Sequence, residues 1–234
     1  MRLITGPFVR IWLGTLGAFA SFGFILLVLP LYVKDELDRG SLGVGIAVGA
    51  ASITAVLAGP PVGRLADRRG RRVMIVVGAF VMVGCYLALA LAPSLPFVVL
   101  VRLLAGAGEA AFAIAVLTVA ADLAPADRRG EAMSLVTTAS YLGLTIGPVA
   151  ADFILGDGRF AAAWFVAALL VVLAGAAVIP LGETRPEAAK QEASEGWLPP
   201  RTALLPGLLV MLALLGFGGF VAFAALYARE LGIE

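Results

Sequence analysis

The chain has 234 residues, of which 61% are apolar and 14% are charged, and its mean hydropathy is +1.02. A soluble domain is about half apolar and about a quarter charged, so this composition indicates an integral membrane protein built from helices. With no His, one Cys and a net charge of +1, the chain offers no His-dependent catalysis, no disulfide framework, no thiolate metal site and no reason to expect nucleic acid as a partner.

Seven stretches with few or no charges follow one another along the chain, and each is long enough to cross a bilayer as a helix. The predicted spans are 11–33, 40–63, 73–101, 97–121, 132–151, 160–182 and 202–228. About 20 helical residues cross a hydrocarbon layer of about 30 Å. The third and fourth spans overlap because one apolar run is divided by a turn with two prolines at 92–96. Strands are excluded, since the runs are too long and lack alternation.

The first span could instead be a cleaved signal peptide, whose apolar stretch is about 7–15 residues long. The stretch at 11–33 is longer and has no small-residue cleavage site, which favours a membrane helix. The distribution of Lys and Arg then predicts the orientation. Twelve of them lie on the side of the N-terminus and four on the opposite side. Because cytoplasmic loops are rich in Lys and Arg, we expect a multi-pass protein of the cell (plasma or inner) membrane with a cytoplasmic N-terminus.

The spans divide into a six-helix bundle over 1–182, a charged and proline-containing linker over 183–201, and one further helix within 202–234. The last helix repeats features of the first at an offset of 195: Phe217-Gly218 matches Phe22-Gly23, and Leu226-Tyr227 matches Leu31-Tyr32. Repeats of six helices are a known plan of transporters. We therefore expect the chain to be the first part of a protein of about 12 helices, and to need the missing C-terminal half or a second copy to act.

The loop between the second and third spans is rich in arginine. It reads Gly63-Arg64-Leu65-Ala66-Asp67-Arg68-Arg69-Gly70-Arg71-Arg72. Arginines at a membrane edge bind anionic headgroups and fix topology. Asp67 can also pair with Arg71 within one helical turn, Gly70 permits a tight reversal, and the spacing of Gly59 and Gly63 permits close approach of another helix.

This loop resembles the signature G-x-L-A-D-R-x-G-R-R of the major facilitator superfamily of secondary transporters, and the six-helix half and the charged linker fit that family as well. The resemblance implies that Asp67, Arg71 and Arg72 form charge pairs that latch the cytoplasmic side in one conformation, with partners in the other half. Gly63, Arg68 and Gly70 belong to the same predicted switch loop. The alternative is that the loop serves topology and anchoring alone.

The 97–121 span carries two charges inside the membrane, Arg102 and Glu109, and Glu109 is at its centre. A charge there costs about 2.5–3.5 kcal/mol on insertion scales, so it should face a cavity or a partner. A separation of seven residues is two helical turns, so both side chains lie on one face of the helix, about 10 Å apart along its axis. At that distance they can pair only if their long side chains extend toward each other. Their surroundings resemble the family's R-x-x-x-G-x-G-x-A pattern, whose Arg is associated with proton coupling. We expect Glu109 to exchange a proton while Arg102 tunes its pKa or binds an anionic group. The alternative is a static hydrogen bond between the two that orders the bundle.

The 132–151 span contains Gly143, Gly147 and Pro148, which resemble the G-x-x-x-G-P signature of the family's exporters. Glycines at this spacing let a neighbouring helix come close, and the proline removes a backbone bond and bends the helix. The loop that precedes this span, 125–131, could pair with the arginines of the 63–72 loop. The segment 180–185 resembles an end-of-half motif of sugar porters. Tyr32, Tyr141 and Trp164 could contact substrate or anchor the chain at the membrane interface.

Together these patterns predict an all-α membrane protein and, by resemblance, a proton-coupled antiporter that exports small molecules. The protein is expected not to be an enzyme, to need no cofactor or metal, and to draw its energy from a proton gradient. A sugar or metabolite symporter of the same family is the alternative. A receptor or membrane enzyme is less consistent with the cytoplasmic N-terminus and the scattered acidic residues.

Overall fold

The apolar spans form helices, because in a bilayer each backbone N–H and C=O must be bonded within its own segment. The computed structural model describes residues 3–156 and 158–184, together with isolated helical positions between 205 and 227. Six described helices are long and apolar enough to cross a membrane. They are α1 (Gly6–Asp35), α2 (Ser41–Arg69), α3 (Arg71–Leu89), α4 (Leu95–Leu123), α5 (Arg129–Leu155) and α6 (Phe160–Val178), with short 3₁₀ turns η1 (Ala126–Arg128) and η2 (Ile179–Leu181).

The helix boundaries follow local sequence signals. The two-proline segment separates α3 from α4, as predicted, with Pro96 in the first turn of α4, where a missing N–H costs nothing. Gly70 separates α2 from α3 and has φ of +105°, a conformation that favours glycine. The predicted reversal at Gly70 is therefore confirmed. Pro148 lies inside α5, which stays helical from Arg129 to Leu155.

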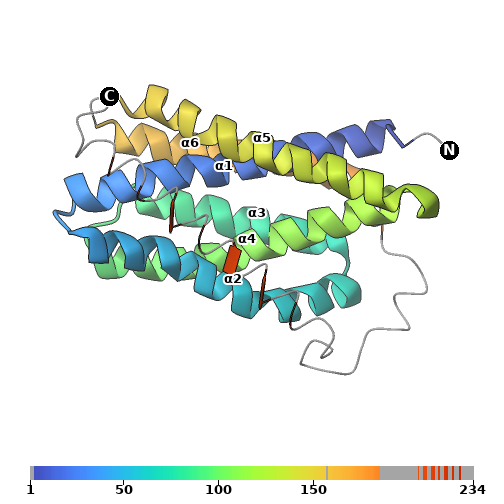
Figure 1. Cartoon of the computed structure of the whole chain (residues 1–234), viewed down its shortest axis with the longest axis horizontal. Coiled ribbons are helices and arrows are strands. Elements are labelled where there is room, and N and C mark those ends of the chain that lie inside the picture. Colours follow the sequence, from blue (N-terminus) through green and yellow to red (C-terminus); the bar gives the residue numbers. More distant parts are fainter. Residues whose placement is uncertain are drawn as a thin grey trace.

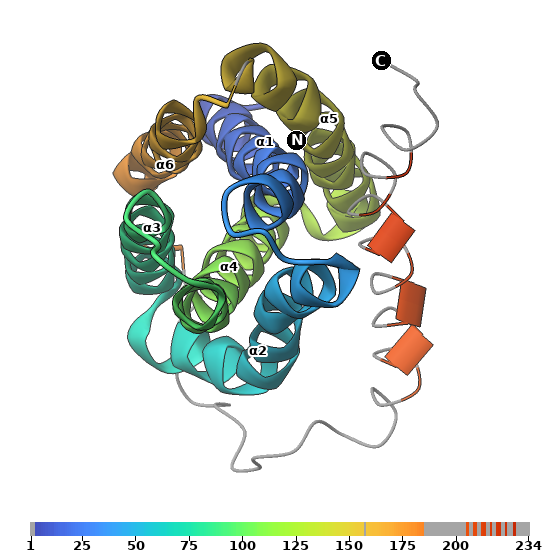
Figure 2. The ribbon, with the colours of Figure 1, turned by 90° about the vertical axis from the view of Figure 1, so that its left-hand side faces the viewer.

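The six helices are arranged in two layers of three (Figures 1 and 2). In one layer α1 runs between α5 and α6, and in the other α4 runs between α2 and α3. The layers meet through α3 with α6 and through α1 with α2 and α4. As a result α1 and α4 are the most buried of the six, and α2 and α5 the least. The candidate coupling residues therefore lie on one of the two innermost helices.

Glycines set the distance between α1 and α5. A Cβ atom on Gly143 would come within 2.5 Å of the carbonyl oxygen of Leu16, and one on Gly147 would meet the backbone of Ala20 and Phe24. Gly23 of α1 faces Leu144 and Pro148 in return. Both predicted glycines of α5 thus permit the close approach of α1, and Pro148 lies in the same interface.

The predicted glycine pair of α2 has no close neighbour in the described part of the chain. Neither Gly59 nor Gly63 has any described atom within 4 Å of the position a Cβ would take. The close contact between α2 and α4 is made further along the helix, where Gly106 of α4 packs on the backbone of Ala51. In the described part of the chain no helix uses the close approach that the spacing of Gly59 and Gly63 permits, because spacing alone does not say which face a neighbour covers.

The predicted seventh helix and the linker fall largely outside the described residues. Of the linker, the structure describes Glu183 and Thr184, which lie against the six-helix bundle. Residues 185–204 are not described, and of the residues matched in the predicted repeat only Tyr227 is described in the second copy.

Candidate functional site

Arg102 and Glu109 form an ion pair in the middle of the bundle. Nη1 of Arg102 donates a hydrogen bond of 2.9 Å to Oε1 of Glu109. The two residues are separated by two turns of α4, and the reach of the long arginine side chain closes the distance between them. Direct pairing was not expected from the axial separation, so that part of the sequence analysis is corrected.

A third side chain completes this cluster. The hydroxyl of Tyr86, on α3, donates a hydrogen bond of 3.1 Å to the same oxygen, Oε1 of Glu109. Tyr86 is fully buried and Arg102 is 1% exposed. Sequence reasoning missed Tyr86, because the register between the antiparallel α3 and α4 cannot be read from either helix alone. We call Tyr86, Arg102 and Glu109 the coupling cluster.

The hydrogen-bonding groups of the cluster are only partly satisfied by its own contacts. The Nε atom of Arg102 is buried and has no hydrogen-bond partner among the described residues. The side chain of Glu109 keeps 12% of its surface exposed, whereas that of Arg102 keeps 2%. Removing one partner of a buried ion pair destabilises a protein by about 3–5 kcal/mol, because the other charge is left buried without compensation. Glu109 is thus the member of the pair with access to the outside of the bundle.

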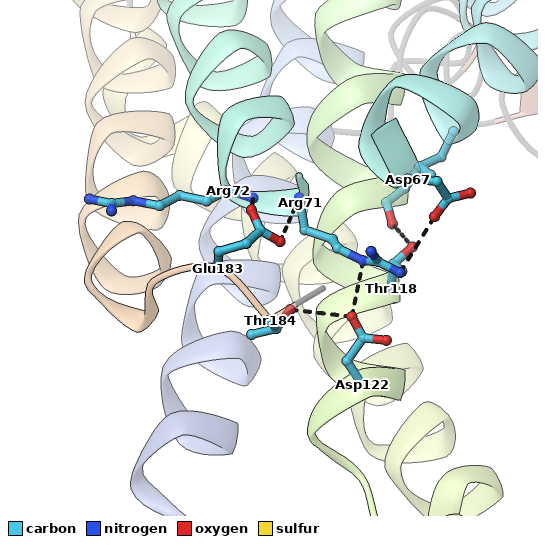
Figure 3. A network of polar contacts seen from close by, with 8 residues as sticks. Asp67, Arg71, Arg72, Thr118, Asp122, Glu183 and Thr184 are labelled. Atoms are coloured by element: carbon cyan, nitrogen blue, oxygen red, sulfur yellow. Dashed lines mark hydrogen bonds and ion pairs between the residues drawn. The ribbon is translucent and has the colours of Figure 1, made fainter. Parts of the chain in front are cut away.

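A second polar cluster occupies the end of the bundle where residues 63–72 lie, which we call the arginine-rich end (Figure 3). Arg71 is 4% exposed, and its Nε lies 3.0 Å from Oδ2 of Asp122, at the end of α4. Its Nη2 lies 3.4 Å from Oδ1 of Asp67. The pair of Asp67 and Arg71 therefore forms as the spacing predicted, but it joins the end of α2 to the start of α3 across Gly70.

The structure thus finds partners for Arg71 within the described bundle, where the resemblance implied partners in another half. Asp122, the closer of the two, was not singled out from the sequence. It looks like one more acidic residue near a helix end, and only the fold brings it to Arg71.

The carboxylate of Glu183 caps the N-terminus of α3. It accepts hydrogen bonds from the backbone N–H groups of Arg71, at 3.0 Å, and Arg72, at 3.3 Å (Figure 3). A negative charge is stabilised there because the first N–H groups of a helix have no partner inside the helix. Thr184 donates to Oδ2 of Asp122 at 3.2 Å. The end of α6 is therefore fastened to α3 and α4 at the arginine-rich end.

The remaining candidates are placed as follows. Arg68 is exposed near the end of α2. Glu131, in the first turn of α5, pairs with Arg128 at 2.7 Å and not with the 63–72 loop, with which the 125–131 segment could have paired. Tyr32 stacks edge-on against Trp164 and Phe160 and donates to the carbonyl of Ala92, so it joins helices within the bundle.

Tyr141 is 63% exposed on α5.

Among the residues that the structure describes, no group of three or more His, Cys, Asp or Glu side chains is arranged to hold a metal ion.

The fold and these clusters define a multi-pass helical membrane protein with ionisable groups in its interior. Comparison with known sequences gives the family. The profile described as Major Facilitator Superfamily matches residues 11–234. The chain belongs to the major facilitator superfamily, a family of transporters rather than enzymes, as the loop signature had suggested.

Among curated relatives, the chain is 32% identical over 167 residues to "Multidrug resistance protein 2" of Bacillus subtilis, an alignment covering 71% of this chain and 42% of the relative. It is 31% identical over 168 residues to "Multi-drug resistance efflux pump PmrA homolog" of Lactococcus lactis, covering 70% and 40%. It is also 28% identical over 149 residues to "D-xylose transporter" of Levilactobacillus brevis, covering 62% and 32%. The chain spans less than half the length of each of these relatives.

Among solved structures, the human organic anion transporter MFSD10 matches with a TM-score of 0.67 and 20% identity, over 84% of this chain and 51% of that one. At this identity the likeness concerns the fold alone.

Proposed function

We propose that the chain is part of a secondary transporter that exports small molecules in exchange for protons. The observation that carries this proposal is the coupling cluster, in which a carboxylate at the middle of α4 pairs with a buried arginine and keeps part of its own surface exposed. Holding a charge at this depth is costly, so such residues in membrane helices usually serve a functional pathway. Two relatives described as multidrug resistance or efflux proteins favour export.

In the proposed mechanism, Glu109 takes up a proton from one side of the membrane and releases it to the other. Protonation removes the negative charge that faces Arg102, so the two forms of Glu109 stabilise different arrangements around α4. The described bundle then rocks against a second bundle, supplied by a C-terminal half or a second copy, and substrate binds between them. The contacts of Arg71 with Asp67 and Asp122 latch the arginine-rich end, which we place on the cytoplasmic side of the cell membrane.

The experiment measures export of a fluorescent lipophilic cation from cells expressing the gene that encodes this chain. Glu109→Gln keeps the size of the side chain and removes its proton exchange. The matched control is Glu131→Gln, at an exposed position in the first turn of α5. We expect Glu109→Gln to abolish export driven by a proton gradient, while Glu131→Gln retains it.

The competing interpretation is a static bond between Arg102 and Glu109 that orders the bundle. Under that interpretation Glu109→Gln loses thermal stability but the folded fraction still couples transport to the proton gradient. Full proton-driven export by purified, folded Glu109→Gln would refute the proposed role.

A sugar or metabolite symporter is a second candidate function, favoured by the similarity to the D-xylose transporter. The direction of coupling separates the two. In vesicles with a proton gradient directed inward, a symporter accumulates substrate and an antiporter expels it. Uptake of a labelled sugar that follows the proton gradient would support the second candidate.

A further inference from the structure

Tyr86 is the member of the coupling cluster whose role is not yet explained, because Glu109 can exchange a proton beside Arg102 without it. Tyr86 comes from a different helix, is fully buried, and donates its hydroxyl hydrogen to Glu109. A phenylalanine would fill the same space at this position without the cost of burying a hydroxyl group. The hydroxyl therefore needs an explanation.

The two donors converge on one carboxylate oxygen. Nη1 of Arg102 and the hydroxyl of Tyr86 both bind Oε1, at 2.9 and 3.1 Å. Among the described side chains, none donates a hydrogen bond to Oε2, and this oxygen is not among the fully enclosed atoms that lack a partner. Oε2 is thus the oxygen through which the side chain of Glu109 keeps contact with the outside of the bundle.

We infer that Tyr86 is a positioning residue for proton exchange: its hydroxyl holds Oε1 of Glu109, so that Oε2 is presented as the atom that gains and loses the proton. The inference rests on the proposed role of Glu109. A carboxyl group can rotate about its last torsion, and a single arginine contact leaves that rotation possible. A second donor on the same oxygen, from a different helix, restricts it. When Oε2 takes a proton, Oε1 can still accept the hydrogen bond from Tyr86, so the group stays in place through the cycle.

The other charged groups near Glu109 are few. From α3, Cys85 adjoins Tyr86, and it is buried. On α4 itself the only other charge in the membrane interior is Arg102. The charged residues of α1, α2 and α5 lie near the ends of those helices. They are at positions 10, 34 and 35 in α1, within 64–69 in α2, and at 129, 131 and 152 in α5. Arg102 and Tyr86 are therefore the described side chains that bind the carboxylate of Glu109 directly.

The experiment is an infrared pH titration of the purified chain in lipid nanodiscs, following the C=O band of protonated Glu109. The band is assigned by its absence in Glu109→Gln. Tyr86→Phe removes only the hydroxyl. Because a hydrogen bond to a charged group favours the ionised form, its loss should move the midpoint of the band to higher pH by about one unit. The frequency of the band should also change, since Oε1 loses a hydrogen bond.

Tyr32→Phe is the matched control. It also removes a hydroxyl that donates a hydrogen bond, at 2.7 Å to the carbonyl of Ala92, but far along the chain from Glu109. It should leave the midpoint unchanged even if it lowers thermal stability. A midpoint in Tyr86→Phe that equals those of the wild type and Tyr32→Phe would overturn the inference.

Transport distinguishes failure of this inference from failure of the proposed function. If Glu109→Gln loses proton-driven export, the pH midpoint of export should move in Tyr86→Phe in the same direction as the band. Loss of coupling in Glu109→Gln with an unmoved midpoint in Tyr86→Phe would refute the role of Tyr86 alone. Retained coupling in Glu109→Gln would refute the proposed function, whereas the infrared result on the position of the carboxyl group would remain.

Discussion

The contact between α1 and α5 depends on the absence of a side chain at Gly147. A Cβ atom at this position would overlap the carbonyl oxygen of Ala20 and lie 2.7 Å from the backbone nitrogen of Phe24. These are backbone atoms of a helix, which cannot move aside as the end of a flexible side chain can. Gly147→Ala must therefore separate α5 from α1 or distort one of them.

Two effects oppose each other in this variant. Replacing glycine by alanine inside a helix stabilises the helix by about 1 kcal/mol, because glycine loses more backbone entropy on folding. Overpacking a close contact costs about 1–3 kcal/mol, and occasionally more. The overlap here is with backbone atoms, which puts the cost at the upper end of that range. We expect a net loss of about 1–2 kcal/mol, or a fall of about 2–8 °C in Tm for a chain of this size.

The buried thiol of Cys85, the single cysteine of the chain, provides the assay. A dye that becomes fluorescent on reaction with thiols reports its exposure as the protein is heated in detergent. The matched control is Gly49→Ala on α2, where no described atom lies within 4 Å of the new Cβ. That variant should melt at or slightly above the temperature of the wild type. The reasoning is refuted if Gly147→Ala melts at or above the temperature of Gly49→Ala.

Two further predictions concern the arginine-rich end and the orientation. Asp122→Asn removes the nearer carboxylate from a buried guanidinium and should destabilise the bundle by about 3 kcal/mol; an unchanged Tm in the thiol assay would contradict the burial of that pair. A cysteine in place of Glu36, in the α1–α2 loop, should react with a membrane-impermeant maleimide in intact cells. A cysteine in place of Glu131, in the exposed first turn of α5, should react only after the membrane is opened. The reverse labelling pattern would place the N-terminus outside.

The sequence predicted the helices well because a bilayer allows few alternatives. Charge-free length and the two-proline turn placed six of the spans, and the structure extends four of them by a few residues, as at α5, which begins at Arg129 rather than 132. The predicted end of the third span at 101 is wrong, because α3 ends at Leu89, before the two-proline turn. The layered arrangement was not predictable from these signals. Helices that are apolar on all sides give little indication of which face meets which neighbour.

The candidate sites were predicted only in part, because the sequence shows unusual residues but not the contacts between helices. Arg102 and Glu109 are conspicuous because charges are rare inside membrane helices, and the structure brings them together. Tyr86 and Asp122 are ordinary residues in their own segments, and their contacts depend on the register between helices. The glycines of α5 and those at 59 and 63 have the same spacing, yet only the former contact a neighbour in the described part of the chain. Spacing indicates what a helix face permits, and the fold decides whether it is used.

The cap on α3 bears on how this protein can be recombined with its relatives. Glu183 follows α6 and its 3₁₀ turn, so a chimaera with its junction at 182 would keep all six helices and lose the carboxylate that binds the N–H groups of Arg71 and Arg72. A junction after Thr184 would keep both the cap and the bond to Asp122. For exchange of halves between transporters of this family, the working unit therefore ends two residues beyond the point where the apolar span does.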